Sequence, residues 1–281
     1  MSVAVITGGA GGMGLATARL MGRTQRVLIA DLRADALERA SEDLRLSGVE
    51  VETLVCDVAD RSSVEQLFAS AGSLGKVQSV VHTAGLSPSM AAPEMIMRVN
   101  GLGTAHVGEA FLSIASSGSC LVNVASSAGH LPPIFPVPTG TYKLAIASPE
   151  RFVSKLVARC NLAPERLRSG LAYTISKNFV IWYSRQRAAA FGTKGVRIMS
   201  VSPGSFDTAM GRLEDVRGAG ALAAHAALGR YGSVEEIAVV LAFCASEQPG
   251  YLTGTDILVD GGAAAAMTIR DMLAMTRQVK S

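Results

Sequence analysis

The sequence is poor in charge, in aromatic side chains and in cysteine, and each shortage narrows the possible functions. Only 17% of its 281 residues are charged, and the net charge of +3 comes with no long basic run, which argues against a nucleic-acid partner. The four cysteines (56, 120, 160 and 244) have no CxxC spacing, so the sequence predicts neither a disulfide framework nor a metal site. No apolar run reaches membrane-spanning length and no basic leader is present, so we expect a soluble, cytoplasmic protein without a membrane partner.

What the sequence does contain is a regular alternation of short apolar runs and longer amphipathic segments. The apolar runs predict strands at 3–7, 26–31, 51–56, 79–83, 120–126, 196–201 and 256–259. The amphipathic segments predict helices from near residue 12 and at 34–46, 64–71, about 92–116, 171–191 and 234–245. This alternation indicates an α/β fold, a single-domain, Rossmann-like, doubly wound parallel sheet of about seven strands. We place the domain at residues 1–262 and a short C-terminal tail at 263–281.

One long segment, residues 130–170, interrupts this alternation ahead of the 171–191 helix. It opens with a proline-rich stretch, and the serine and proline at 148–149 then suit the start of an amphipathic helix. A long connection with its own helix is typical of a lid or an interface element, and the alternative is a surface decoration that packs only on itself. We expect this helical insert at the rim of a substrate cleft, with apolar cover from Leu144, Phe152 or Leu156.

A glycine-rich loop follows the first predicted strand and opens the first predicted helix. Residues 7–14 read TGGAGGMG, in which Gly8 permits a tight turn, Gly12 lets a pyrophosphate approach the backbone and Gly14 allows close helix packing. The helix N-terminus beyond them stabilises phosphate charge. A glycine triplet alone is weak evidence, because such turns also form structural corners. Its place between a strand and a helix predicts a dinucleotide site formed by Gly8, Gly12, Met13 and Gly14.

Asp31 ends the second predicted strand, where the adenosine ribose of a dinucleotide is expected to lie. A carboxylate there accepts hydrogen bonds from the ribose hydroxyls and repels a 2′-phosphate, by on the order of 4 kcal/mol at about 4 Å and an effective dielectric constant of about 20. Arg33 is close enough to compensate, but it also suits a solvated position in the next helix. The sequence therefore predicts NAD. Asp57 and Val58 fit the adenine edge, with capping of a turn as the alternative for Asp57.

Three separated residues predict a proton-transfer site. Tyr173 and Lys177 lie four residues apart on one helical face, so we expect the ammonium to lower the pKa of the phenol from about 10. Ser126, at the end of the fifth strand, can hold a substrate oxygen while Tyr173 exchanges the proton. Asn100, in the long helix, can anchor a water that connects Lys177 to solvent. Because tyrosine and lysine at this spacing are common on helices, the combination with the glycine loop and Ser126 carries the specificity.

These motifs stand in the order found in the short-chain dehydrogenase/reductase family, which the chain resembles from residue 3 to residue 262. Residues 98–101 resemble the family's asparagine helix and residues 122–126 its serine strand. The resemblance implies a catalytic tetrad, and it implies that the tyrosine and lysine also contact the cofactor. The matching residues here are Asn100, Ser126, Tyr173 and Lys177.

The same resemblance implies the remaining cofactor contacts. Residues 202–208 resemble the loop that holds the nicotinamide carboxamide, which assigns Pro203, Gly204, Phe206 and Thr208 to the cofactor site. The family usually has Asn-Asn-Ala-Gly after the fourth strand, whereas residues 82–85 read His-Thr-Ala-Gly here. Because the last two positions match, the resemblance assigns Ala84 and Gly85 to the cofactor site. His82 replaces the first asparagine and is expected to be structural.

The chain is similar to the bacterial 3α-hydroxysteroid dehydrogenase/carbonyl reductase branch of the family in its insert, in the departure at residues 82–83 and in residues 171–173 and 187–190. This similarity implies an NAD-dependent oxidoreductase that interconverts a secondary alcohol and a ketone on a small hydrophobic substrate, with steroids among the candidates. A reductase of another carbonyl class, such as a 3-oxoacyl thioester, is the alternative. A non-catalytic NAD-binding scaffold is another, although the intact tetrad argues against it. We expect a homo-oligomer and favour a dimer, because the insert lies beside the surface through which the family's tetramers pack.

Overall fold

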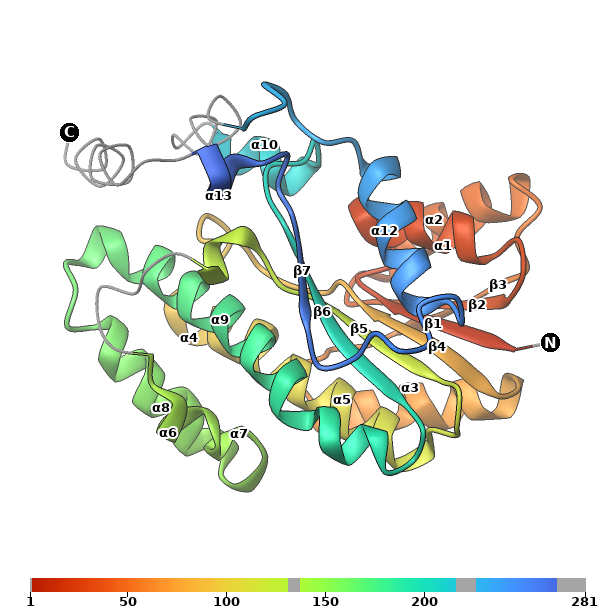
Figure 1. The fold of residues 1–281 in the computed structure, drawn as a ribbon, viewed down its shortest axis with the longest axis horizontal. Coiled ribbons are helices and arrows are strands. Elements are labelled where there is room, and N and C mark those ends of the chain that lie inside the picture. The colour runs from red at the N-terminus through yellow and green to blue at the C-terminus, as the bar shows by residue number, and fades with distance from the viewer. Residues whose placement is uncertain (1, 131–136, 216–225, 267–281) are drawn as a thin grey trace.

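The computed structural model describes residues 2–130, 137–215 and 226–266, and its centre is a parallel sheet of seven strands (Figure 1). The strand order is β3-β2-β1-β4-β5-β6-β7, so the chain winds outward in both directions from β1 and β4. This arrangement confirms the predicted doubly wound α/β fold. The strands are β1 Val3–Thr7, β2 Arg26–Asp31, β3 Val51–Val55, β4 Val77–His82, β5 Cys120–Val124, β6 Arg197–Pro203 and β7 Asp256–Val259.

Helices cover both faces of the sheet, which explains why its central strands β1 and β4 are buried along their whole length (Figure 1). One face packs against α1 (Gly12–Met21), α2 (Ala34–Leu46) and α12 (Val234–Ala245). The other face packs against α3 (Arg61–Leu74), α5 (Gly103–Ile114) and α9 (Glu165–Gly192). The chain also forms two short helices near the carboxyl ends of the strands, α10 (Ala209–Asp215) and α13 (Ala263–Ala266).

The helix expected at about 92–116 is interrupted by a π-helical stretch. Its parts are α4 (Pro93–Ile96), the π-helix η1 (Met97–Leu102) and α5. Asn100 lies within η1, and its side chain is bonded to other elements. At Gly101, an added Cβ would lie 2.9 Å from Cε1 of Phe152, so only glycine admits that ring. Two residues of the π-helix thus contact other elements of the fold, and π-helical turns are frequent at functional sites.

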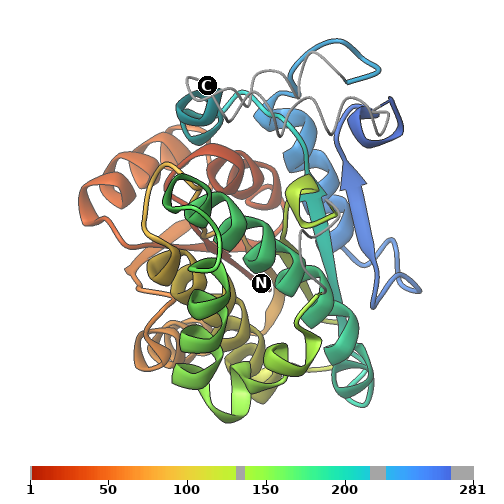
Figure 2. The ribbon, with the colours of Figure 1, turned by 90° about the vertical axis from the view of Figure 1, so that its left-hand side faces the viewer.

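The insert forms three helices that lie outside α9, on the side away from the sheet (Figure 2). They are α6 (Thr139–Tyr142), α7 (Leu144–Ala147) and α8 (Pro149–Cys160), and α8 packs against η1, α4 and α9. Pro149 is the first residue of α8 as expected, although the Ser148 side chain makes no capping hydrogen bond. The proline-rich residues 131–136 lie outside the described part of the chain.

The prediction that Phe152 and Leu156 cover a substrate is wrong. Both side chains are fully buried in the hydrophobic core, and the ring of Phe152 lies 4.8 Å from that of Phe179 in α9. Leu144, the third expected residue, is half-buried and packs against the same core. The apolar face of α8 is occupied by the helices beneath it, so it is not available to a ligand.

No helix in the described ranges is long and apolar enough to cross a membrane. Among the same residues, no group of three or more histidine, cysteine or acidic side chains is placed to hold a metal ion. All four cysteines are buried and free. Of the expected tail, residues 263–266 form α13 and residues 267–281 lie outside the described part.

Candidate active site

The glycine loop lies where the carboxyl ends of β1 and β4 meet the N-terminus of α1. Gly8 has a φ of +66°, and a Cβ added there would lie 2.7 Å from the backbone nitrogen of Ala84. A Cβ on Gly14 would lie 2.3 Å from the carbonyl oxygen of Gly8, so helix and loop are in backbone contact. Gly12 also has a positive φ, of +52°, and Met13 is half-buried in the first turn of α1. This narrow loop with its open helix end suits a pyrophosphate.

Asp31 lies beside this loop at the end of β2. Its Oδ2 accepts a hydrogen bond of 3.4 Å from the backbone amide of Ala10, and its Oδ1 accepts one of 3.3 Å from the amide of Arg33. The carboxylate is thereby held against the glycine loop. Arg33 itself is an exposed residue that directly precedes α2, which agrees with the solvated position considered for it from the sequence.

Asp57 follows β3 and caps a turn. Its Oδ1 accepts a hydrogen bond of 2.8 Å from the backbone amide of Ala59, which is the alternative role considered for it. Val58 is buried beside α5, where a Cβ on Gly103 would lie 2.9 Å from Cγ2 of Val58. The structure therefore shows a turn-capping role for Asp57 and a packing role for Val58, and their contact with adenine stays a prediction.

The segment after β6 returns to the glycine loop. Pro203 ends β6, and the amide of Gly204 donates a hydrogen bond of 2.8 Å to a carbonyl of β7. Phe206 is buried. Thr208 lies close to the first helix, since a Cβ added to Gly12 would be 3.9 Å from its Cγ2. Residues separated by nearly 200 positions in the sequence thus line one site at the carboxyl edge of the sheet.

The predicted proton-transfer residues meet next to this site. Tyr173 is half-buried in α9, and the Ser126 hydroxyl is close enough to its phenol to influence its pKa. Lys177 is buried one turn further along, and its Nζ donates a hydrogen bond of 2.9 Å to the carbonyl oxygen of Val124 at the end of β5. Burial lowers the pKa of Lys177 to about 8.

The expected effect of Lys177 on Tyr173 is not what the structure shows. Burial raises the pKa of Tyr173 above its ordinary value, the hydrogen bond with Ser126 lowers it, and the negative charge of Glu214 raises it again. The expectation from the sequence was wrong in sign, because it counted the charge four residues away and not the loss of solvent around the phenol. Tyr173 is therefore a protonated phenol at neutral pH.

Asn100 connects the π-helix to the loop after β4. Its Oδ1 accepts a hydrogen bond of 2.8 Å from the amide of Leu86, and its Nδ2 donates to the carbonyl of Leu86 at 3.0 Å and to Ser176 at 3.1 Å. Gly85 lies between Asn100 and Lys177, since a Cβ added to it would be 3.2 Å from Asn100 Oδ1 and 3.4 Å from Lys177 Nζ. The four predicted tetrad residues thus surround one small region.

His82 has the structural role expected of it. Its Nδ1 lies 2.7 Å from Oγ1 of Thr7, and the ring is fully enclosed. Burial, and to a lesser extent the charge of Lys177, lowers its pKa to about 3, so the ring is neutral. His82 therefore fixes β4 to β1 just before the glycine loop and Ala84.

One residue near the reacting groups had no signal in the sequence. Glu214 of α10 is half-buried and accepts hydrogen bonds from the amide of Ser89, at 3.0 Å, and from the Ser89 hydroxyl. This contact joins the loop after β4 to α10. The Glu214 carboxylate is close enough to Tyr173 for its negative charge to raise the pKa of the phenol. A glutamate in a short helix carries no motif, so only the tertiary structure could reveal this position.

Comparison with known proteins agrees with this geometry. The family profile described as short chain dehydrogenase matches residues 2–163, and one described as enoyl-(acyl carrier protein) reductase matches residues 163–264. A short-chain dehydrogenase/reductase of Alternaria brassicicola is 33% identical over 265 residues, which cover 92% of this chain and 95% of that protein. The chain belongs to the short-chain dehydrogenase/reductase family.

Two further matches extend the comparison. The 3beta-hydroxysteroid dehydrogenase 2 of Eggerthella lenta is 28% identical over 280 residues, covering 93% of this chain and 94% of that protein. The structure of an actinorhodin polyketide ketoreductase with NADPH has a TM-score of 0.73 and 22% identity, with coverage of 93% of this chain and 97% of the other. At that identity the second likeness shows the shared fold alone. As a family member, this chain is an oxidoreductase that uses a nicotinamide cofactor.

Proposed function

We propose that this protein is an NAD-dependent oxidoreductase that interconverts a secondary alcohol and a ketone, with Tyr173 as the proton donor and acceptor. The single observation that carries the proposal is that Tyr173 lies beside Ser126 and buried Lys177, next to the glycine loop. The catalytic unit is residues 1–262, acting as a cytoplasmic homodimer whose molar mass light scattering would measure.

Different residues of the chain bind the cofactor, orient the substrate and transfer the proton. The backbone of Gly8 to Gly14 fits the cofactor's pyrophosphate, and the nicotinamide of a bound cofactor supplies or accepts the hydride. The Ser126 hydroxyl donates a hydrogen bond to the substrate oxygen and orients it. In ketone reduction Tyr173 gives its phenolic proton to that oxygen, and in alcohol oxidation the Tyr173 phenolate takes the hydroxyl proton back.

Two features of the site favour ketone reduction over alcohol oxidation at neutral pH. Burial and the charge of Glu214 hold the pKa of Tyr173 above its ordinary value, so at neutral pH the phenol has the proton that a ketone oxygen needs. The Lys177 ammonium, 5.8 Å from the centre of the Tyr173 ring, offsets part of the negative charge that the phenolate would carry after donation.

The position of Asp31 supports NAD over NADP. Its carboxylate is fixed by two backbone amides at the end of β2, where the adenosine ribose of a cofactor on the glycine loop would lie. A 2′-phosphate there would meet a negative charge. The chain's relatives include a 3beta-hydroxysteroid dehydrogenase, which supports a hydrophobic ring alcohol as the substrate class.

The proposal is tested with purified protein and a panel of hydroxysteroids, aliphatic alcohols and aromatic alcohols, following the absorbance of the reduced cofactor. We expect NAD-dependent turnover of a hydrophobic secondary alcohol and reduction of the matching ketone by NADH. Binding of NAD without turnover of any alcohol or ketone would instead indicate a non-catalytic scaffold. Turnover restricted to 3-oxoacyl thioesters would move the protein to another carbonyl class.

A further inference from the structure

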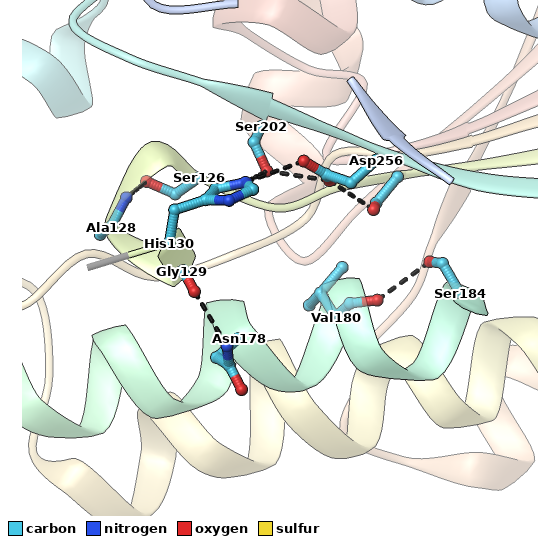
Figure 3. Close-up of polar contacts among 10 residues, drawn as sticks. Ser126, Ala128, Gly129, His130, Asn178, Val180, Ser184, Ser202 and Asp256 are labelled. Carbon is cyan, nitrogen blue, oxygen red and sulfur yellow. Dashed lines mark hydrogen bonds and ion pairs between the residues drawn. The ribbon is translucent and has the colours of Figure 1, made fainter. Parts of the chain in front are cut away.

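A buried carboxylate outside the predicted site is bonded to the segment that carries Ser126. Asp256 begins β7, and its side chain is only 1% exposed. Its Oδ1 accepts hydrogen bonds from the hydroxyls of Ser200, at 2.5 Å, and Ser202, at 2.9 Å (Figure 3). Its Oδ2 accepts one of 2.8 Å from Nε2 of His130, which also lies 3.2 Å from the Ser202 hydroxyl. A buried carboxylate is costly unless it is fully bonded, so this set of partners is specific.

His130 belongs to the same short turn as Ser126. The turn is the 3₁₀-helix η2, residues 127–130, which directly follows Ser126. The amide of Gly129 donates to the Ser126 carbonyl at 2.9 Å, and the amide of Ala128 donates to the Ser126 hydroxyl at 3.2 Å. Ser126 is thus the first residue of a compact bonded unit, and His130 is the last.

A second contact holds this unit from the opposite side. Nδ2 of Asn178, the residue after Lys177 in α9, donates a hydrogen bond of 2.9 Å to the carbonyl of Gly129 (Figure 3). A Cβ added to Gly129 would lie 2.9 Å from the carbonyl carbon of Lys177, so the turn is in contact with the helix backbone. The hydroxyl of Tyr142, from the insert, donates to Oδ1 of Asn178 at 3.1 Å. The turn is therefore held between α9 and β7.

Asp256 is itself placed by the register of the sheet. Successive register partners across five neighbouring strands are Thr7, His82, Asn123, Ser200 and Asp256. The first pair and the last pair are hydrogen-bonded through their side chains. Because partners in a parallel sheet project to the same face, a polar row crosses the sheet beneath α9 and ends at the carboxylate. The position of the carboxylate is thus set by strand pairing and not by a mobile loop.

We propose that Asp256 is a positioning residue for the reaction, acting through His130 to hold the turn that presents the Ser126 hydroxyl to the substrate. The inference rests on the proposed function, in which Ser126 orients the substrate oxygen. Asn178 and Asp256 fix the two sides of the turn, and in the described part of the chain no hydrogen bond joins the Ser126 side chain to β7. A displacement of about 1 Å in a positioning group can lower a rate by about 10²-fold, so support of this kind matters for turnover.

The first test measures turnover of His130→Ala and Asp256→Asn. We expect kcat to fall by about 10- to 100-fold in each, with the Kd for NAD unchanged, because the glycine loop and Asp31 lie at other strands. His130→Gln keeps an N–H donor and should recover much of the loss. Ser200→Ala is the matched control, since it removes a donor to the same carboxylate without touching the turn. An equal loss in Ser200→Ala and His130→Ala would overturn the inference.

The second test asks whether the effect passes through Ser126. In a Ser126→Ala background, His130→Ala should lower kcat by less than about threefold, because the group being positioned is already gone. A loss as large as in the wild-type background would overturn the inference. If Ser126→Ala leaves kcat unchanged while His130→Ala lowers it, the role assigned to Ser126 in the proposed function fails as well.

A third measurement does not depend on activity. Amide hydrogen exchange at residues 128–130 should become at least about tenfold faster in His130→Ala than in the wild type, while exchange at β1 and β2 should stay the same. Because His130 is 34% exposed, this variant is expected to fold even where Asp256→Asn does not. Unchanged exchange in the turn would overturn the inference whatever the substrate proves to be.

Discussion

The ammonium nitrogen of Lys177 lies 5.8 Å from the centre of the Tyr173 ring, one turn along α9. Both groups have lost solvent, and the consequences are opposite in sign. Burial raises the pKa of the phenol and lowers the pKa of the ammonium to about 8. Burial therefore favours the neutral form of each group, so the phenol holds its proton more firmly, and the ammonium loses its proton more readily, than the same groups in water.

Replacing the phenol of Tyr173 tests whether this residue transfers the proton. Tyr173→Phe should lower kcat by about 10²- to 10⁴-fold, the usual contribution of a positioned acid–base group. The Kd for NAD should change little, because the glycine loop and Asp31 are intact. Steady-state rates and a cofactor titration check both statements. Near-wild-type turnover in this variant would remove Tyr173 from the chemistry.

Replacing the ammonium should change how stability depends on pH. Below pH 8 Lys177 is charged in both the folded and the unfolded chain, so its burial costs stability in full. Between about 8 and 10.5 the folded chain has lost the proton while the unfolded chain keeps it, and the cost disappears. The wild type should therefore gain on the order of 3 kcal/mol relative to Lys177→Met over this range.

Urea denaturation at several pH values measures that difference. Lys155→Met is the matched control, because Lys155 is an exposed lysine on α8. Its stability relative to the wild type should not vary across the same range. A Lys177→Met difference that is flat with pH would contradict the assigned burial of the ammonium.

The choice of cofactor should depend on Asp31. Asp31→Ser removes the carboxylate that faces the expected 2′ position, so the ratio of kcat/KM for NADP to that for NAD should rise by between about 10-fold and about 1,000-fold. Asp35→Ser serves as the control, because Asp35 is an exposed carboxylate in the first turn of α2, paired with Arg39. A wild-type enzyme that prefers NADP would refute the assignment directly.

The buried face of the insert should contribute to stability. Phe152 is fully buried against Gly101 and Phe179, so Phe152→Ala should lower the free energy of unfolding by about 3 to 5 kcal/mol. Ile146, in the same insert, is 47% exposed, and Ile146→Ala should cost no more than about 0.5 kcal/mol. Equal midpoints for the two variants in urea would show that α8 does not pack as described.

Much of the fold could be predicted from the sequence, because its signals are local. Apolar runs such as residues 3–7 and 26–31 are bounded by turn residues, and their alternation with amphipathic helices leaves few possible topologies. Tyr173 and Lys177 could be paired for the same reason, since a spacing of four residues fixes one helical face. The glycine loop was recognisable because its strand and helix are adjacent in the chain.

What the sequence could not provide depends on contacts between distant residues. The amphipathic pattern of residues 149–160 predicts that Phe152 and Leu156 pack against apolar groups, but it does not show whether those groups belong to a substrate or to α9. The raised pKa of Tyr173 comes from burial, which has no local signature. His130 and Asp256 are 126 residues apart, and neither belongs to a motif, so only the pairing of the strands brings them together.

The position of β7 at the edge of the sheet has a consequence for how the protein is made. The glycine loop and Asp31 lie within residues 7–31, and β4, which lies beside β1, ends at His82. Asp256 is synthesised long after Asp31, and β7 is the last in sequence of the strands in the described residues. Since synthesis adds about 5–20 residues per second, the residues of the dinucleotide loop are made many seconds before Asp256. Because a domain generally folds as a unit, the anchor of the Ser126 turn can form only after nearly all of the sheet has been synthesised.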